Sequence, residues 1–247
     1  MKALILAAGY ATRMGALAMN RPKALLPVAG RSVLDHLLQA IQSVSSINQV
    51  SLVTNQKFFE NFRSWADERQ ESTVRIINDG TTSNEQRLGA IADIQLAIEQ
   101  GIADEDLLIA AADNIFMLSF PRFVDFFEKH GTDCITAHRE DDLARLRKTG
   151  IVEFDKNGRV ISFEEKPEQP RSQFACPPLY ILKRETLQLV SEYLDSNHNP
   201  DAPGHFIAWL AEKRPLHAFL FEEARYSIGD EVSYRHACES LGPSVKL

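Results

Sequence analysis

Cysteine is scarce in this sequence of 247 residues. The three that occur, Cys134, Cys176 and Cys238, are odd in number and widely spaced. Such a set fits neither a disulfide framework nor the paired spacing of a zinc site. We therefore expect a reducing, cytoplasmic location.

The sequence also lacks an excess of positive charge and a long apolar run. Its formal net charge is -7, whereas a protein that binds nucleic acid or an anionic membrane surface needs a basic face. The first apolar run, residues 3–8, is too short for a signal peptide or a membrane span, because Gly9 and Arg13 follow at once. We expect no nucleic-acid partner and no membrane segment.

Two common phosphate-binding motifs are missing after this first run. The dinucleotide fingerprint needs two more glycines after Gly9, and Ala11 and Met14 occupy those positions. The P-loop would need Gly-Lys-Ser/Thr at residues 14–16, which are Met-Gly-Ala. Histidine-based catalysis is not indicated either, because the seven histidines are scattered without a nucleophile motif beside them.

The residues that are present have the balance of an ordinary globular protein, 44% hydrophobic and 25% charged. Strand-length apolar runs alternate with segments of helical period, of which residues 33–44 and 120–127 are the clearest. The alternation predicts an α/β fold with a mostly parallel central sheet and helices on both faces. The runs predicted as strands are residues 3–7, 50–53, 74–77, 107–112 and 134–137.

The pattern changes after residue 150. Residues 151–154 and 160–163 flank Asn157-Gly158, which predicts a hairpin and a small antiparallel addition to the sheet. Helical periods return at 185–194, 205–213 and 232–241, with a strand near 217–221.

The most informative stretch is residues 6–14, Leu-Ala-Ala-Gly-Tyr-Ala-Thr-Arg-Met, followed by residues 21–28, Arg-Pro-Lys-Ala-Leu-Leu-Pro-Val. Small residues at the end of a strand, here Ala7, Ala8 and Gly9, let backbone N–H groups approach a phosphate closely. Arg13 then supplies a planar, permanently charged fork to hold that phosphate. The two segments therefore predict a phosphate site at the end of the first strand.

These segments resemble the signature of the sugar-phosphate nucleotidyltransferases, of which the glucose-1-phosphate thymidylyltransferases are an example. That signature is Gly-x-x-x-Arg after the first strand, then Pro-Lys-x-x-Leu-x-Val. Residues 113–116, 150–154, 163–167 and 226–230 follow in the family's order, so the resemblance covers essentially the whole chain. It implies a Rossmann-like nucleotide-diphospho-sugar transferase fold in a single domain, residues 1–247. About 1–140 would form the nucleotide-binding half and about 141–247 the acceptor-binding half.

The resemblance also implies a reaction. A nucleoside triphosphate and a phosphorylated small-molecule acceptor, with a sugar 1-phosphate as first choice, would give the NDP-sugar and pyrophosphate with the help of Mg²⁺. The chemistry requires two anions to be positioned and their charge neutralised.

The resemblance assigns roles to residues as follows. The catalytic residues would be Arg13, Lys23 and Lys166. The nucleotide would contact Ala7, Ala8, Gly9, Arg13, Asn84, Gly89 and Asp113, with Asn84 and Gly89 at the base. The acceptor would contact Gly150, Glu165, Lys166 and Tyr180, and the metal ligands would be Asp113, Ser227 and Asp230.

Three departures from the family pattern leave alternatives open. The segment 15–19 is small and apolar, and Pro177-Pro178 replaces a Ser/Thr-Gly pair, so the acceptor could instead be phosphocholine or a similar metabolite used by a cytidylyltransferase. Ser227 stands where the family has Asp, which also leaves a non-catalytic nucleotide-sugar sensor or regulatory subunit as a rival. The sequence identifies neither the nucleobase nor the oligomeric state, and it leaves a homo-oligomer open.

Overall fold

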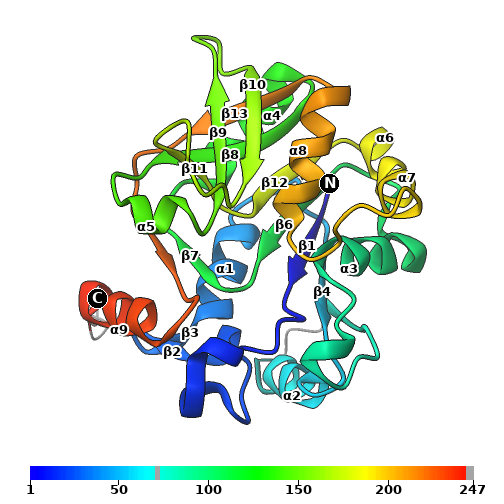
Figure 1. Cartoon of the computed structure of the whole chain (residues 1–247). Helices are drawn as coiled ribbons and strands as arrows, with labels where there is room; N and C mark the ends of the chain where they lie inside the picture. Colours follow the sequence, from blue (N-terminus) through cyan, green and yellow to red (C-terminus); the bar gives the residue numbers. More distant parts are fainter. Residues whose placement is uncertain (70–72, 243–247) are drawn as a thin grey trace. The chain divides into compact units, whose positions relative to one another are not determined.

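The computed structural model describes residues 1–69 and 73–242 and has an α/β architecture (Figure 1). Its residues fall into two compact units that interleave along the chain. Unit 1 comprises residues 1–4, 88–110 and 121–222, and unit 2 comprises residues 5–87, 111–120 and those from 223 onward. The single domain with halves near 1–140 and 141–247 stays a prediction.

The strands of unit 1 have the order β10-β9-β11-β8-β12-β6, and β13 pairs with β8. β12 is antiparallel to both of its neighbours, β6 and β8, whereas β13 is parallel to β8. The strands are β6 (Leu107–Ala111), β8 (Asp133–Arg139), β9 (Gly150–Phe154), β10 (Val160–Glu165), β11 (Phe174–Cys176), β12 (Leu179–Leu182) and β13 (Leu216–Leu220).

The helices of unit 1 precede and alternate with these strands along the sequence. They are α3 (Ala90–Ala97) with the π-helical extension η4 (Ile98–Ile102), α4 (Phe120–His130), α5 (Leu143–Leu146), α6 (Arg184–Leu187), α7 (Leu189–Asp195) and α8 (Pro203–Lys213). The helix expected at 185–194 is thus divided between α6 and α7.

Unit 2 carries the last two residues of β1, then β4 and β5, which are parallel to each other, and two small antiparallel pairs, β2 with β3 and β7 with β14. The strands are β1 (Lys2–Leu6), β2 (Pro27–Val28), β3 (Arg31–Ser32), β4 (Gln49–Thr54), β5 (Val74–Asn78), β7 (Asn114–Phe116) and β14 (Arg225–Ser227). The helices are α1 (Val33–Gln42), α2 (Phe59–Arg69), α9 (Glu231–Leu241) and the 3₁₀ turns η1 (Thr12–Ala18), η2 (Lys23–Leu25) and η3 (Asn84–Gln86).

The α/β class is confirmed, with a large mixed sheet. Its antiparallel part is larger than the small addition expected, because β11 and β12 lie between β9 and β6. The hairpin forms as expected around Gly158, whose φ of +82° is the left-handed conformation that glycine adopts without strain. Ser32 and Asp35 stand three residues apart at the start of the helical period 33–44, a local sequence signal for a capping box, and the box forms: the Ser32 hydroxyl accepts the Asp35 N–H and the Asp35 carboxylate accepts the Ser32 N–H.

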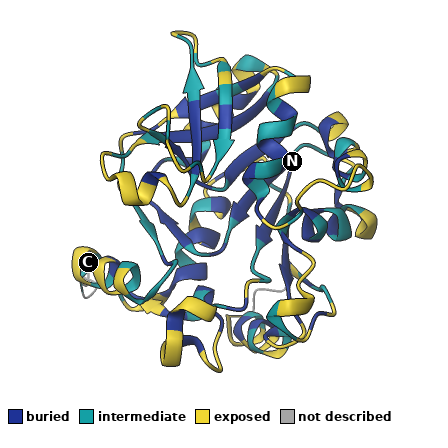
Figure 2. Ribbon diagram, viewed as in Figure 1, coloured by how far each residue is buried: buried dark blue, intermediate teal, exposed yellow. Residues whose placement is uncertain are grey.

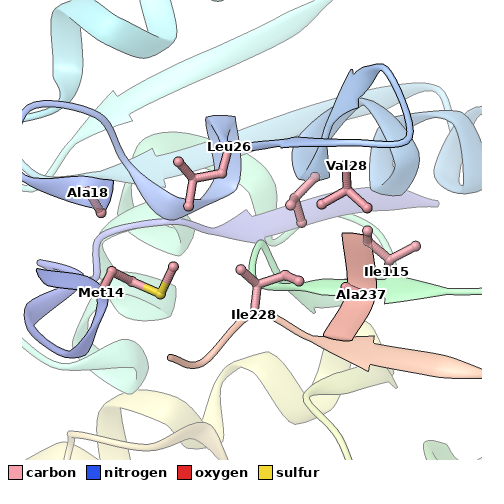
Figure 3. Close-up of a cluster of buried hydrophobic side chains, with 8 residues drawn as sticks. Met14, Ala18, Leu26, Val28, Ile115, Ile228 and Ala237 are labelled. Atoms are coloured by element: carbon pink, nitrogen blue, oxygen red, sulfur yellow. The ribbon is translucent and has the colours of Figure 1, made fainter. Parts of the chain in front are cut away.

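Strands β6 and β12 in unit 1 and β4 in unit 2 are buried along nearly their whole length (Figure 2). In unit 2 a separate apolar cluster supports the loops that follow β1 (Figure 3). It joins Met14 and Leu26 to Ile115, Ile228 and Ala237, all of them buried. Each methionine, leucine or isoleucine side chain among them contributes about 1.5–3 kcal/mol through burial, so this cluster anchors the loop at Met14 and Leu26.

No helix within the described residues is long and apolar enough to cross a membrane. Cys134, Cys176 and Cys238 are free thiols, as the sequence predicted.

Candidate functional sites

The loop after β1 has the properties of an anion-binding backbone. The Ala7 N–H donates to the Val53 carbonyl at 2.8 Å, and the Asn55 side-chain amide donates to the Ala8 carbonyl at 2.8 Å. In the part of the chain that the structure describes, the N–H groups of Ala8 and Gly9 have no hydrogen-bond partner. The loop is therefore held through its carbonyl oxygens while two of its donors remain available to an anion.

Gly9 is exposed, and a Cβ atom placed on it would have Lys23 Cε as its nearest neighbour, at 4.0 Å. The glycine thus opens space directly beside the Lys23 side chain. Arg13 lies further along, in η1, and its side chain is exposed. It has no hydrogen-bond or ion-pair partner among residues 1–69 and 73–242.

Lys23 and Asp113 form an ion pair, with Nζ 2.5 Å from Oδ2. Lys23 begins the short turn η2, which is closed by hydrogen bonds from Leu25 N–H to the Pro22 carbonyl and from Leu26 N–H to the Lys23 carbonyl. Asp113 lies just after β6, and its carbonyl accepts the Ile228 N–H at 2.7 Å. Both side chains keep about a fifth of their surface exposed, at 21% and 23%, so a ligand can reach the pair.

The environment keeps Asp113 charged. Burial acts to raise the pKa of its carboxyl, but the charge and hydrogen bond of Lys23, together with the charge of Arg225, outweigh it and lower the pKa below its ordinary value.

The sequence reasoning gave no role to two neighbours of this pair. The Asn114 side-chain amide donates to Asp113 Oδ1 at 2.8 Å, and Arg225 Nη1 donates to Asn114 Oδ1 at 2.7 Å. Asn114 adjoins Asp113 in the motif, which was a usable signal. Arg225 is 111 residues away from Asn114, and no local pattern marks it.

Ser227 and Asp230 occupy different settings. Ser227 pairs with Asn114 in the β14–β7 ladder, which places it beside the residue that follows Asp113. Asp230 is the N-cap of α9, and its Oδ1 accepts the Ser233 N–H at 2.9 Å. The Asp230 carboxylate therefore already has a structural role.

The two residues expected at the base fall in different units, Asn84 in unit 2 and Gly89 in unit 1. The Asn84 side-chain amide has no hydrogen-bond partner among the residues described. Gly89 has a φ of +93°, and a Cβ there would lie 2.5 Å from the Pro200 carbonyl oxygen. Glycine at this position is therefore required by packing, whatever its role toward a ligand.

In unit 1 the Glu165 carboxylate lies in a slot between two glycines. A Cβ on Gly150 would lie 3.2 Å from Glu165 Oε2, and a Cβ on Gly204 would lie 2.6 Å from Glu165 Cδ and closer still to Oε2. The Glu165 side chain is 8% exposed, and its contact with Lys166 Nζ is 3.4 Å long. Burial raises the pKa of Glu165, and the charges of Lys166 and His205 oppose this effect. A buried, weakly paired carboxylate is costly and marks a candidate ligand contact.

Lys166 has a left-handed backbone, with a φ of +50° in front of Pro167. Its N–H donates to the Thr149 carbonyl at 3.1 Å, and the Thr149 hydroxyl donates to the Cys176 carbonyl at 3.2 Å. These bonds hold a conformation that is unfavourable for lysine and fix the direction in which its chain leaves β10.

Tyr180 is fully enclosed in β12, and burial followed by the charges of Cys176 and Glu165 raises its pKa well above the ordinary value. Pro177 and Pro178 form the turn that leads into β12, in which the Leu179 N–H donates to the Pro177 carbonyl at 2.7 Å. That carbonyl is therefore already engaged within the chain.

Taken unit by unit, the structure brings Ala7, Ala8, Gly9, Lys23, Asp113 and Ser227 onto neighbouring segments of unit 2, and brings Gly150, Glu165, Lys166 and Tyr180 together in unit 1. The model of the nucleotidyl transferase family matches residues 2–241, nearly the whole chain. The chain belongs to this family.

Two relatives and two solved structures illustrate the similarity. The glucose-1-phosphate adenylyltransferase of Thermotoga neapolitana is 28% identical over 251 residues, which cover 95% of this chain and 59% of the relative. The corresponding protein of Thermotoga maritima is 26% identical over the same shares. This chain therefore spans about three fifths of the length of these curated relatives.

A Bacillus anthracis protein assigned as a glucose-1-phosphate thymidylyltransferase, crystallised with sucrose, has a TM-score of 0.82 at 20% identity, covering 98% of this chain and 95% of its own. A UDP-glucose pyrophosphorylase in complex with UDP-glucose has a TM-score of 0.79 at 18% identity, covering 97% of both chains. Such nucleotidyl transferases share the fold of this chain.

Proposed function

We propose that this nucleotidyl transferase couples a nucleoside triphosphate to a sugar 1-phosphate and releases pyrophosphate. A phosphate oxygen of the acceptor attacks the α-phosphorus, a new P–O bond forms, and the bond from the α-phosphorus to the bridging oxygen of the leaving pyrophosphate breaks. The observation that carries the proposal is the Lys23–Asp113 pair beside the open backbone of Gly9. The curated relatives also carry names of sugar-1-phosphate nucleotidyltransferases.

The two units supply different parts of the proposed chemistry. In unit 2, the Ala8 and Gly9 N–H groups and Arg13 would hold the triphosphate, and Lys23 would stabilise charge that develops at the α-phosphate. In unit 1, Lys166 would bind the phosphate of the acceptor, and Glu165 would accept hydrogen bonds from its hydroxyl groups. Asn84 and Gly89 would contact the base.

The Asp113 carboxylate and the hydroxyl of Ser227, which lies opposite Asn114, offer oxygen atoms of the kind that Mg²⁺ prefers, so they fit an ion that arrives with the nucleotide. The described residues contain no group of three His, Cys, Asp or Glu side chains able to hold a metal by themselves. Mg²⁺ commonly takes one or two protein carboxylates and fills its other positions with water and substrate phosphates. Asp113 would be the principal ligand and Ser227 a weak one. When bound, the ion would neutralise part of the triphosphate charge.

The decisive experiment is a pyrophosphate-release screen of ATP, GTP, CTP, UTP and dTTP against glucose 1-phosphate, mannose 1-phosphate and phosphocholine. We expect release that needs both a triphosphate and an acceptor and that stops when EDTA removes Mg²⁺. A preference for CTP with phosphocholine would instead identify the cytidylyltransferase alternative. Nucleotide binding without turnover on any pair would favour the non-catalytic sensor and overturn the proposal.

The second metal contact gives a further prediction. Ser227→Asp is expected to tighten Mn²⁺ binding, measured by electron paramagnetic resonance, by about tenfold if the added carboxylate contributes about 1.4 kcal/mol. The matched control is Asp230→Asn, because asparagine caps a helix as well as aspartate while removing the charge. If Asp230→Asn weakens Mn²⁺ binding and Ser227→Asp leaves it unchanged, Asp230 is the ligand and the assignment to Ser227 is wrong.

A further inference from the structure

The Asp113 carboxylate is held from two sides by a chain of three hydrogen bonds within unit 2. Lys23 Nζ binds Oδ2 at 2.5 Å, and the Asn114 amide nitrogen binds Oδ1 at 2.8 Å. The Asn114 amide oxygen then accepts from Arg225 Nη1 at 2.7 Å. Asn114 is 2% exposed, so water cannot readily replace either of its partners.

The chemistry of these groups permits one arrangement of the Asn114 amide. An ionised carboxylate accepts hydrogen bonds and cannot donate, whereas a guanidinium donates and cannot accept. Both neighbours are satisfied when the amide nitrogen faces Asp113 and the amide oxygen faces Arg225. If the amide turned over, its oxygen would face the carboxylate and its nitrogen would face the guanidinium, and both contacts would become repulsive.

Backbone pairing between β7 and β14 also brings these side chains together, apart from the side-chain hydrogen bonds described above. In the ladder between β7 and β14, Ser227 lies opposite Asn114 and Arg225 lies opposite Phe116. Ile228, which continues β14, is buried in the apolar cluster. Removing the Arg225 side chain should therefore leave the strand in place and take away only the partner of the Asn114 amide oxygen.

We propose that Arg225 is a positioning residue that orients the Asp113 carboxylate through the Asn114 amide. The inference rests on the proposed function, in which Asp113 is the metal ligand. With Arg225 present, Asp113 offers its remaining lone pairs in one fixed direction. Without it, the buried Asn114 amide oxygen loses its partner, so the amide that binds Oδ1 is no longer held in place and the direction of the carboxylate is less well fixed. Groups of this kind around metal ligands typically change metal affinity or activity by about 10- to 100-fold.

The test compares Arg225→Met, which removes the donors, with Arg225→Lys, which keeps one. We expect Arg225→Met to weaken Mn²⁺ binding to the full chain and to lower kcat by about tenfold each, with the KM for the triphosphate changed less than kcat. Arg225→Lys should recover most of both losses. The matched control is Arg235→Met, an arginine on α9 that is 70% exposed and pairs with Glu231. It should change neither quantity.

A coupling measurement separates positioning from a merely structural role. Once Asn114→Leu has removed the link, adding Arg225→Met should cause no further loss of Mn²⁺ affinity. If Arg225→Met lowers thermal stability but leaves Mn²⁺ affinity and kcat unchanged, the inference is wrong. The proposed function has its own criterion. If Asp113→Asn fails to weaken Mn²⁺ binding, Asp113 is not the metal ligand. If Asp113→Asn weakens Mn²⁺ binding but Arg225→Met does not, only the positioning role of Arg225 is wrong.

Discussion

Lys23→Ala and Asp113→Asn are each expected to lower kcat by about two orders of magnitude, the scale for losing a main electrostatic stabiliser at a reacting centre. Lys23 would lose its interaction with charge that develops on the α-phosphate. Asp113→Asn would remove the carboxylate that holds the metal. Because the two side chains are in contact, with Nζ and Oδ2 2.5 Å apart, the double variant should lose less than the product of the two single effects.

The measurement is pyrophosphate release at saturating substrates, with circular dichroism and urea unfolding to establish that each variant is folded. Removing one member leaves the other charged and partly buried, so a loss of stability is expected beside the loss of activity. Lys57→Ala is the matched control, because Lys57 is an exposed lysine of unit 2 whose Nζ lies over the Phe58 ring. A folded Lys23→Ala enzyme with near-normal kcat would show that its assigned role is wrong.

Gly204→Ala is expected to raise the KM for the acceptor and lower kcat/KM by about tenfold or more, while the KM for the triphosphate changes little. The new Cβ would overlap the Glu165 carboxyl group, with Cδ at 2.6 Å, so Glu165 must leave its slot. A displaced Glu165 loses its hydrogen bonds to the acceptor, and bonds to a charged group contribute about 1.5–3 kcal/mol each.

The sign of the stability change in Gly204→Ala shows whether the new Cβ clashes with Glu165. In an unhindered helix, alanine is more stable than glycine by about 1 kcal/mol, so a destabilised Gly204→Ala protein would point to the clash. Shortening the neighbour in Gly204→Ala/Glu165→Asp should recover stability without recovering activity on the acceptor. If Gly204→Ala leaves the KM for the acceptor unchanged, Glu165 is not an acceptor contact.

Local sequence signals predicted the parts of this fold that depend on neighbouring residues. The Ser32–Asp35 capping box and the turn at Asn157-Gly158 each involve residues close in sequence, and both form. The strand runs of β1, β4, β5, β6 and β8 were predicted because continuous apolar character is required of strands covered on both sides. β11 was missed because Phe174–Cys176 is three residues long and precedes two prolines.

The candidate sites were predictable where one motif carries the chemistry. Arg13, Lys23 and Asp113 each stand in a short pattern whose residue types suit phosphate or metal binding. The Asn114–Arg225 bond joins segments 111 residues apart, and the Glu165 slot depends on the absent side chain of Gly204. Neither leaves a periodicity or a motif, since each arises from tertiary packing of distant segments.

The apolar cluster of unit 2 has a consequence for the order of events during synthesis. It joins Met14 and Leu26 to Ile228 and Ala237 (Figure 3). Contacts of such high sequence separation form late, because the intervening chain must first be made and its loop entropy overcome. The loop that carries Gly9 and Lys23 is therefore translated before residues 88–110 and 121–222 of unit 1, whereas its packing partners Ile228 and Ala237 are translated after them.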